Sequence, residues 1–323
     1  MLEEDFYRTY SKYLRDIYGE KVYKLPVKLN LSCPNRDGNI ATGGCIFCGE
    51  GGSGDFTIYY EGKRLSREEL IYNHQEIPKG DYIAYFQSFT NTYAPTSKLR
   101  EIFTAALEDD LFAGISIATR PDCLQKDVIE LLKELKEKYI NKFIWVELGL
   151  QTIHESTAKW MNRGYPLEVF DEAVKNLKAI DIEVIVHIII GLPGENQTML
   201  LETIEHLNAC QIDGVKLQLL HYLKNTRLGI QYLSNPSQYH VLEMDEYVEL
   251  VTECVAHLDE HIVIHRLTGD GNAEDLIAPL WSTDKRRVLN LINHMLKIKN
   301  YTQGCKLSKP GGIYTNFVIE KNS

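Results

Sequence analysis

The sequence predicts an α/β protein: a partial, TIM-like barrel of six strand–helix units, a (β/α)6 fold, followed by a C-terminal extension. Short runs of β-branched residues are each followed by a helical pattern, and alternation at steps of roughly 30 residues is typical of repeated βαβ units. Runs that are apolar on both faces, such as residues 184–190, favour a parallel sheet covered by helices. Functional residues of such a barrel lie at the C-terminal ends of its strands.

The elements follow in order from these patterns. Strands are expected at residues 27–31, 82–86, 114–118, 143–148, 183–190, 214–220 and 261–265. Amphipathic helices are expected at 97–107, 126–138, 166–179, 196–210 and 244–258, the third of them beginning at Pro166, where a missing N–H is tolerated. A short helix near 66–74, a helix near 285–299 and a possible strand at 313–319 fall outside the repeat. We therefore divide the chain into a helical lead-in (1–24), the barrel (25–270) and a basic C-terminal extension (271–323).

The charge of the chain is unevenly distributed. The net charge of −10 argues weakly against a nucleic-acid partner, but residues 284–323 hold eight Lys or Arg against two carboxylates. This segment therefore carries +6 and the remainder −16. A basic patch on an acidic body can bind phosphates, although a solvated helix surface would look the same.

The sequence also bears on the compartment. No run approaches the ~20 apolar residues that span a bilayer, and the N-terminus has no apolar export signal. The seven cysteines have no paired spacing. We therefore expect a cytoplasmic protein with reduced thiols and no membrane partner.

Three of the cysteines form the most informative pattern. Cys33, Cys45 and Cys48 are separated by eleven and two residues, follow the first expected strand, and include an aromatic, Phe47, just before the last. Three thiolates can hold three irons of a 4Fe–4S cluster and leave the fourth iron open for a small molecule. A structural zinc site is the alternative, but its fourth ligand, a second Cys-x2-Cys or a His pair, does not follow.

With these cysteines the chain resembles radical S-adenosylmethionine (SAM) enzymes. The wide first spacing resembles the branch related to the catalytic subunit of Elongator. The same branch is indicated by TRPD at 119–122, VELGLQT at 146–152, MNRG at 161–164 and HIIIGLPG at 187–194. Later stretches, RLTGD at 266–270, APLW at 278–281 and VLN at 288–290, resemble the smaller YhcC/YtqA group. The resemblance implies a radical SAM barrel with a 4Fe–4S cluster and SAM as cofactors.

It also implies SAM contacts at the strand ends, for which the candidates are Gln87, Ser88, Gln151, Arg163, Gly191 and Pro193. Gln151 is placed to bond ribose hydroxyls, and Arg163 to pair with a carboxylate. Gly191 lets the backbone approach an adenine or a methionine chain. The superfamily's Gly-Gly-Glu element is absent, so backbone carbonyls near Gln87 and Ser88 are expected to take the amino group instead.

Polar residues inside otherwise apolar strands are the candidate catalytic residues. Glu147, His187 and Lys216 stand in the fourth, fifth and sixth expected strands. A buried carboxylate or imidazole needs a partner, so a satisfied core pair is the alternative to a catalytic role. Gln218, His221 and Arg266 could line the same pocket.

The resemblance implies that one electron, from a donor such as flavodoxin or ferredoxin, leads to cleavage of SAM and a 5′-deoxyadenosyl radical. The YhcC/YtqA group is associated with wobble-uridine side chains of bacterial tRNA. We therefore expect tRNA as substrate, bound through the basic C-terminal region, and conversion of 5-carboxymethylaminomethyl-2-thiouridine toward 5-aminomethyl-2-thiouridine. The alternatives are a radical SAM enzyme that acts on a small metabolite and a non-catalytic zinc-binding scaffold.

Overall fold

The computed structural model describes residues 6–49, 51–52, 57–63, 80–269 and 273–307. The helix expected near 66–74 and the strand expected at 313–319 lie outside the described residues. None of the helices in these ranges is both long and apolar enough to cross a membrane.

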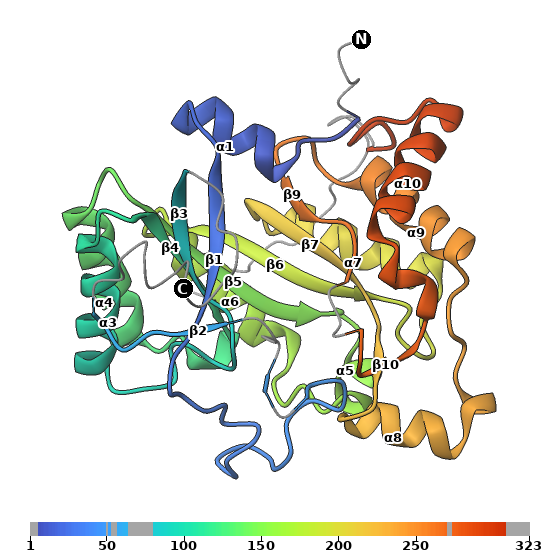
Figure 1. Ribbon diagram of the computed structural model, residues 1–323, viewed down its shortest axis with the longest axis horizontal. Helices are drawn as coiled ribbons and strands as arrows, with labels where there is room; N and C mark the ends of the chain where they lie inside the picture. The colour runs from blue at the N-terminus through green and yellow to red at the C-terminus, as the bar shows by residue number, and fades with distance from the viewer. Residues whose placement is uncertain (1–5, 50, 53–56, 64–79, 270–272, 308–323) are drawn as a thin grey trace, which may run out of the picture.

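One parallel sheet forms the centre of the molecule, with its strands in the order β2-β1-β3-β4-β5-β6-β7-β9 (Figure 1). Their bounds are β1 Val22–Lys28, β2 Ile58–Tyr59, β3 Asp81–Phe86, β4 Phe112–Thr119, β5 Phe143–Gln151, β6 Glu183–Ile190, β7 Gly214–Leu219 and β9 Val263–Arg266. Every neighbouring pair is parallel. The expected partial barrel is confirmed: β9 corresponds to the strand expected at 261–265, and β2 is a short strand that the sequence did not predict.

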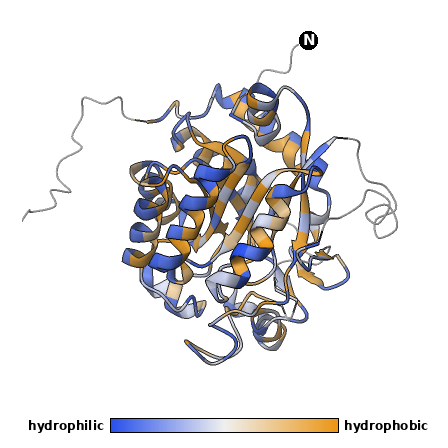
Figure 2. Cartoon of the chain, turned by 90° about the vertical axis from the view of Figure 1, so that its left-hand side faces the viewer, coloured by the Kyte–Doolittle hydropathy of each residue, from blue (hydrophilic) through white to orange (hydrophobic). Residues whose placement is uncertain are grey.

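Helices cover the outer face of this sheet. They are α3 Thr96–Glu108, α4 Lys126–Lys138, α6 Leu167–Lys178, α7 Gln197–Ala209, α9 Met244–His257 and α10 Lys285–Lys299. Alternate strand residues, such as Val184, Val186 and Ile188 of β6, join the large core between sheet and helices. In Figure 2 the hydrophobic colour lies on the central strands and the hydrophilic colour on the outer faces of the helices.

The opposite, inward face of the sheet is closed at its N-terminal end. Helix α1 (Tyr10–Tyr18) begins at Thr9, whose side chain accepts a hydrogen bond from the Lys12 N–H. Leu14 of this helix packs with inward residues from the beginnings of five strands, namely Val22, Ile83, Ala113, Trp145 and Ile185. We call this apolar group the plug. It leaves the C-terminal ends of the strands as the open end of the barrel.

Several short elements lie at that open end. They are α5 (Glu155–Trp160), α8 (Arg227–Ser234) and the antiparallel pair of β8 (Tyr222–Leu223) and β10 (Leu276–Ala278). The sequence did not predict them, because runs of two to eight residues carry little periodicity. In Figure 1 helix α10 begins beside β10, so the C-terminal extension starts at the same end of the barrel.

Candidate active site

A cavity of about 280 Å³ opens at the C-terminal ends of the strands. It brings together most of the predicted site residues, which come from segments far apart in the sequence: Cys33, Cys45, Cys48, Gln87, Glu147, Gln151, Arg163, His187 and Lys216. Gln218, His221 and Arg266 line it as well. The prediction that these side chains share one site therefore agrees with their positions.

The cysteine loop is held in place by backbone and side-chain bonds to the segment after α5. The Ile46 N–H donates to the Met161 carbonyl (3.0 Å), and the Asn162 amide donates to the Gly44 carbonyl (2.8 Å). Asn35 donates both to the Asn162 carbonyl (2.6 Å) and to the Cys45 sulfur (3.6 Å). The eleven residues between Cys33 and Cys45 are thus an ordered part of the site, tied to the MNRG stretch.

The three thiols face one another across a desolvated end of the cavity. Burial raises the pKa of Cys45 to about 12, and the neighbouring Cys48 adds to this effect while Arg120 opposes it. Burial likewise raises the pKa of Cys48. Such thiols become thiolates when a positively charged centre binds them, which is the chemistry of a metal or cluster site.

The sulfurs of the cysteine loop are not gathered as tightly as in a preformed zinc site. Among the described residues, the group of three potential ligand atoms within 4.8 Å of one another is Asp171, His206 and Cys210, so at least one pair of the three sulfurs lies farther apart than that. Zn–S bonds of 2.3 Å in a tetrahedral site place sulfurs roughly 3.8 Å apart.

The end of β5 is shaped by an irregular turn. Gln151 has φ 65°, and the pairing register between β5 and β6 shifts between Gly149 and Gln151. When the side-chain amide of Gln151 is oriented so that its nitrogen faces acceptors, Nε2 donates a hydrogen bond to the Leu150 carbonyl at 2.9 Å. The irregularity directs this side chain to the cavity rather than along the pleat.

Arg163 lies at the same turn, but its guanidinium is engaged by the protein. Its donors reach the carbonyls of Tyr165 (3.1 Å), Leu150 (3.1 Å) and Thr152 (2.6 Å). Its fourth partner is the Glu155 carboxylate at 2.9 Å. The expected carboxylate partner is therefore a residue of the protein itself, and Arg163, 1% exposed, fixes the chain after β5.

The other expected SAM contacts are divided. Gln87 lines the cavity, whereas Ser88 is buried beside it with its Oγ unpartnered among the described residues. Gly191 and Pro193 line a second cavity of about 330 Å³ instead. Gly191 has φ +89° and its Cα faces Leu242, because the chain turns outward after β6. The structure does not bring these two residues to the cysteine cavity.

The floor of the cavity is a buried ionic cluster centred on Glu147, which is 1% exposed. Its carboxylate accepts from His187 Nε2 (2.6 Å) and from Ser116 Oγ (2.6 Å), and it forms ion pairs with both Lys24 and Lys216. Two further residues join the cluster: Tyr85, whose hydroxyl accepts from Lys216 Nζ (3.0 Å), and His265, 3.3 Å from Lys24 Nζ. We call these residues the ionic floor.

The protonation of the floor follows from burial and charge. Burial alone would raise the pKa of Glu147, but Lys216 and Lys24 hold it well below its usual range. Burial lowers the pKa of Lys216 to about 7, and burial with the charge of Lys216 lowers that of His187 to about 4. Near neutral pH the floor therefore holds one carboxylate, a neutral imidazole at His187, and two amines that compete for that carboxylate.

The basic start of α10 lies close enough to the cavity to affect His221. His221 lines the cavity with its Nε2 buried and unpartnered among the described residues. Burial and the charge of Lys285 lower the pKa of His221 to about 4, and burial, with the charge of Arg266, lowers the pKa of Lys285. Arg286 and Arg287 follow as exposed residues in the same helical turn.

The rest of the basic extension contributes less than its charge implies. Lys299 forms ion pairs with Glu249 and Glu253, and Lys306 pairs with Glu253 at 2.6 Å. Lys309 and Lys321 lie outside the described residues. Within the described part of the extension, the basic residues considered for substrate binding are therefore those in the first turn of α10, and the cationic residues that line the cavity itself come from the barrel: Arg36, Arg120, Arg163, Lys216 and Arg266.

Sequence reasoning missed Lys24, Tyr85 and Arg120 as site residues. Arg120 donates to both Asp122 oxygens (2.9 and 2.6 Å) and to the Arg163 carbonyl (2.8 Å), which links the TRPD and MNRG stretches beside the cysteines. Its motif was a usable signal. Lys24 and Tyr85 carried no such signal, because neither stands in a motif: Lys24 lies in a strand of mixed polarity and Tyr85 in a mostly buried one.

Comparisons with known proteins agree with this geometry. The model of the Radical SAM superfamily matches residues 36–207, and that of the Radical_SAM C-terminal domain matches residues 212–297. The chain is 43% identical over 303 residues to YtqA of Bacillus subtilis (strain 168), which covers 93% of this chain and 92% of that protein. It is 31% identical over 294 residues to YhcC of Escherichia coli (strain K12), covering 91% and 93%.

Among solved structures, the archaeal Methanocaldococcus infernus Elp3 with an N-terminal deletion superposes with a TM-score of 0.62. The match covers 87% of this chain but 64% of that chain, so this chain spans about two thirds of it. At 15% identity the likeness concerns the fold alone.

Proposed function

Because the chain belongs to the radical SAM superfamily, we propose that it modifies the wobble-uridine side chain of tRNA, converting 5-carboxymethylaminomethyl-2-thiouridine toward 5-aminomethyl-2-thiouridine. As a member of this superfamily the chain is an enzyme that uses a 4Fe–4S cluster and SAM. The conversion breaks the C–N bond between the side-chain nitrogen and the methylene that bears the carboxylate. Loss of one hydrogen atom and then of one electron, to a single-electron carrier of the flavodoxin or ferredoxin class, and of a proton from the nitrogen would give an imine at that methylene, which water hydrolyses to the aminomethyl product and glyoxylate. A methylene carbon of this kind is a target for radical chemistry.

The residues of this chain have distinct proposed roles. Cys33, Cys45 and Cys48 would hold three irons, and Gln87 and Gln151 at the strand ends would contact SAM. When bound, the cluster and SAM supply a 5′-deoxyadenosyl radical that takes a hydrogen atom from the substrate. The protein orients the reacting carbon toward that radical and keeps water out, tasks that fall to the cavity walls and the ionic floor.

The catalytic residues expected from the sequence take their place in the floor. Glu147, His187 and Lys216 lie at the bottom of the cavity, where they would contact the substrate side chain. Arg163 acts as a positioning residue for Gln151, since all its described partners are protein groups around the β5 turn.

The proposed substrate rests on one observation: the cavity lined by the three cysteines lies near the N-terminus of α10, which is rich in basic residues. Lys285, Arg286 and Arg287 occupy the first turn of α10, where the helix dipole adds positive potential. A polynucleotide backbone could rest there while one base enters the cavity. The likeness of the fold to an Elp3 structure is consistent with this substrate.

The proposal includes the partners and the location. A single-electron donor such as flavodoxin or ferredoxin would reduce the cluster, since the chemistry starts from a reduced state. A cytoplasmic location follows from a tRNA substrate and from seven cysteines without disulfide bonds.

The test uses the anaerobically reconstituted enzyme with dithionite, SAM and synthetic anticodon stem-loops. The wobble position carries uridine, the carboxymethylaminomethyl derivative or the aminomethyl derivative. We expect 5′-deoxyadenosine, scored by mass spectrometry, to rise only with the carboxymethylaminomethyl stem-loop, together with an aminomethyl product. Deoxyadenosine that is indifferent to RNA, or binding that does not weaken with salt, would reject tRNA and point to a small metabolite.

A further inference from the structure

The ionic floor contains more amine groups than carboxylates to pair with them. Lys24 and Lys216 both form ion pairs with the single carboxylate of Glu147, while burial keeps His187 and His265 neutral. Lys216 is 4% exposed, so its charge has little access to water. Buried charges are costly unless they are paired, and here one anion serves two cations. The floor is therefore electrostatically incomplete.

Lys216 is the cation of this pair that meets the cavity. An ammonium group has three N–H donors, and the described contacts of Lys216 use two of them, on Glu147 and on the Tyr85 hydroxyl (3.0 Å). Lys216 lines the cavity, whereas Lys24 does not. A third donor is thus available to a ligand that enters from the open end.

A second cation stands beside Lys216. Arg266, the last residue of β9, is its register partner on the adjacent strand, and both side chains line the cavity. Like charges on directly neighbouring strand positions repel, and the charge of Arg266 is among the causes that lower the pKa of Lys216. A ligand anion that reaches Lys216 from the open end would therefore approach both positive groups.

Lys216 and Arg266 lie below the strand ends. In register they are level with His187 and Gly149, and Gly149 precedes Gln151, at the end of β5, by two residues, roughly 7 Å along a strand. The cysteines lie in the loop beyond the strand ends. A ligand that enters from the open end would therefore contact these cations with its innermost group.

We propose that Lys216, with Arg266 beside it, is the subsite for a carboxylate of the substrate side chain. This inference rests on the proposed function, in which the carboxymethylaminomethyl group carries such a carboxylate and its aminomethyl product lacks one. The subsite would hold the carboxylate at the floor and present the adjacent methylene carbon toward the open end. It would also explain release, since the product loses the group that is bound.

The first experiment compares Lys216→Gln and the charge-conserving Lys216→Arg with the unmodified enzyme. The substrates are stem-loops with the carboxymethylaminomethyl group or its uncharged primary amide. We expect unmodified enzyme to favour the carboxylate by roughly tenfold to a hundredfold in kcat/KM, the range of a charge-assisted hydrogen bond. Lys216→Gln should lose that preference and Lys216→Arg should retain part of it. Iron content and thermal unfolding of the reconstituted variants verify that they are folded and loaded.

The second experiment needs no RNA and separates the two proposals. The free base N-(uracil-5-ylmethyl)glycine should protect Lys216 from an amine-reactive reagent, read by peptide mass spectrometry, and its amide should not. Protection without any response to stem-loops would retain the carboxylate subsite and reject the tRNA substrate. Turnover of stem-loops with an unchanged carboxylate preference in Lys216→Gln, or absence of protection, would overturn the subsite.

Discussion

Replacing Glu147 with glutamine is the sharpest test of the ionic floor. The side chain is 1% exposed and accepts from Lys24, Lys216, His187 and Ser116. Glutamine has nearly the same shape but no charge, so two ammonium groups would remain in a desolvated layer without their anion. Breaking a buried ion pair by removing one partner costs about 3–5 kcal/mol, and we expect a loss of this size in the free energy of unfolding near pH 7.

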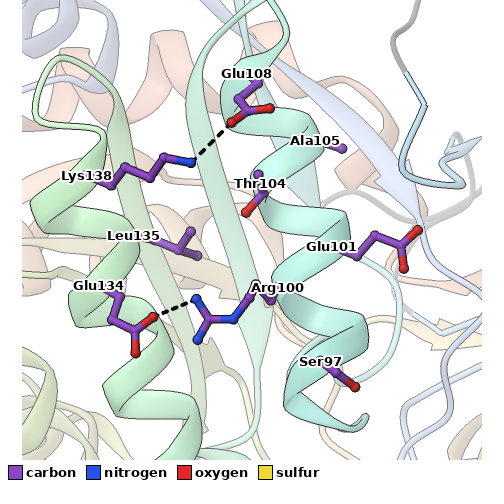
Figure 3. Close-up of a pocket in the computed structure, with 9 residues that line it drawn as sticks. All are labelled: Ser97, Arg100, Glu101, Thr104, Ala105, Glu108, Glu134, Leu135 and Lys138. Atoms are coloured by element: carbon purple, nitrogen blue, oxygen red, sulfur yellow. Dashed lines mark hydrogen bonds and ion pairs between the residues drawn. The ribbon is translucent and has the colours of Figure 1, made fainter.

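The assay is urea unfolding of the cluster-free enzyme, compared with a surface control. Glu134→Gln removes a carboxylate that is 56% exposed and lies 2.6 Å from Arg100, between α3 and α4 (Figure 3). Exposed pairs contribute little, so the control should lose less than about 1 kcal/mol. Adding Lys216→Met to Glu147→Gln should recover part of the loss. A Glu147→Gln variant as stable as the control would refute the account of the floor as a coupled charge cluster.

Three further outcomes follow from the same structure. Cys48→Ala should lower the iron of the reconstituted enzyme well below the roughly four atoms of a cubane and abolish deoxyadenosine formation, and full iron retention would contradict its assignment as a ligand. The pKa of His187 is about 4 in the folded protein and about 6.5 in the unfolded chain, so the unfolded chain takes up the proton first as the pH falls. The free energy of unfolding should therefore fall by up to about 3 kcal/mol between pH 6.5 and pH 4, and by less in His187→Gln. Charge reversal of Arg286 and Arg287 should weaken stem-loop binding at least tenfold and reduce its salt dependence, measured by fluorescence anisotropy, whereas reversal of Arg100 on α3 should not.

The sequence predicted the strongly periodic parts of the fold well. The strand Glu183–Ile190 and the helices Lys126–Lys138 and Lys285–Lys299 have the expected bounds. The first strand was placed wrongly, at 27–31 instead of Val22–Lys28. Pro26 and two lysines make this stretch unlike a buried strand. The proline is tolerated because β2 pairs only with the two residues that follow it.

The sequence predicted those site residues whose chemistry requires a characteristic spacing along the chain. The cysteine triad and the strand-end residue Gln151 line the expected cavity. Gly191 and Pro193 line the neighbouring cavity instead, because a glycine-rich turn indicates a bend but not its direction, and their contact with SAM stays a prediction. Arg163 illustrates a different limit: its residue type indicates carboxylate binding, yet only the fold reveals that Glu155 and three carbonyls already occupy its donors.

The position of the ionic floor within the barrel argues for its purpose. On each of four strands the inward-facing residue of the plug is apolar, and the next inward-facing residue, two positions later, is polar or charged. The pairs are Val22 and Lys24, Ile83 and Tyr85, Trp145 and Glu147, and Ile185 and His187. An apolar layer of the same volume would have stabilised the fold at least as well, because buried ion pairs often contribute less than well-packed hydrophobic side chains. The charges begin where the plug ends and the cavity starts, and they converge on one carboxylate. The position of these charges is better explained by the binding of a ligand from the open end than by the stability of the barrel.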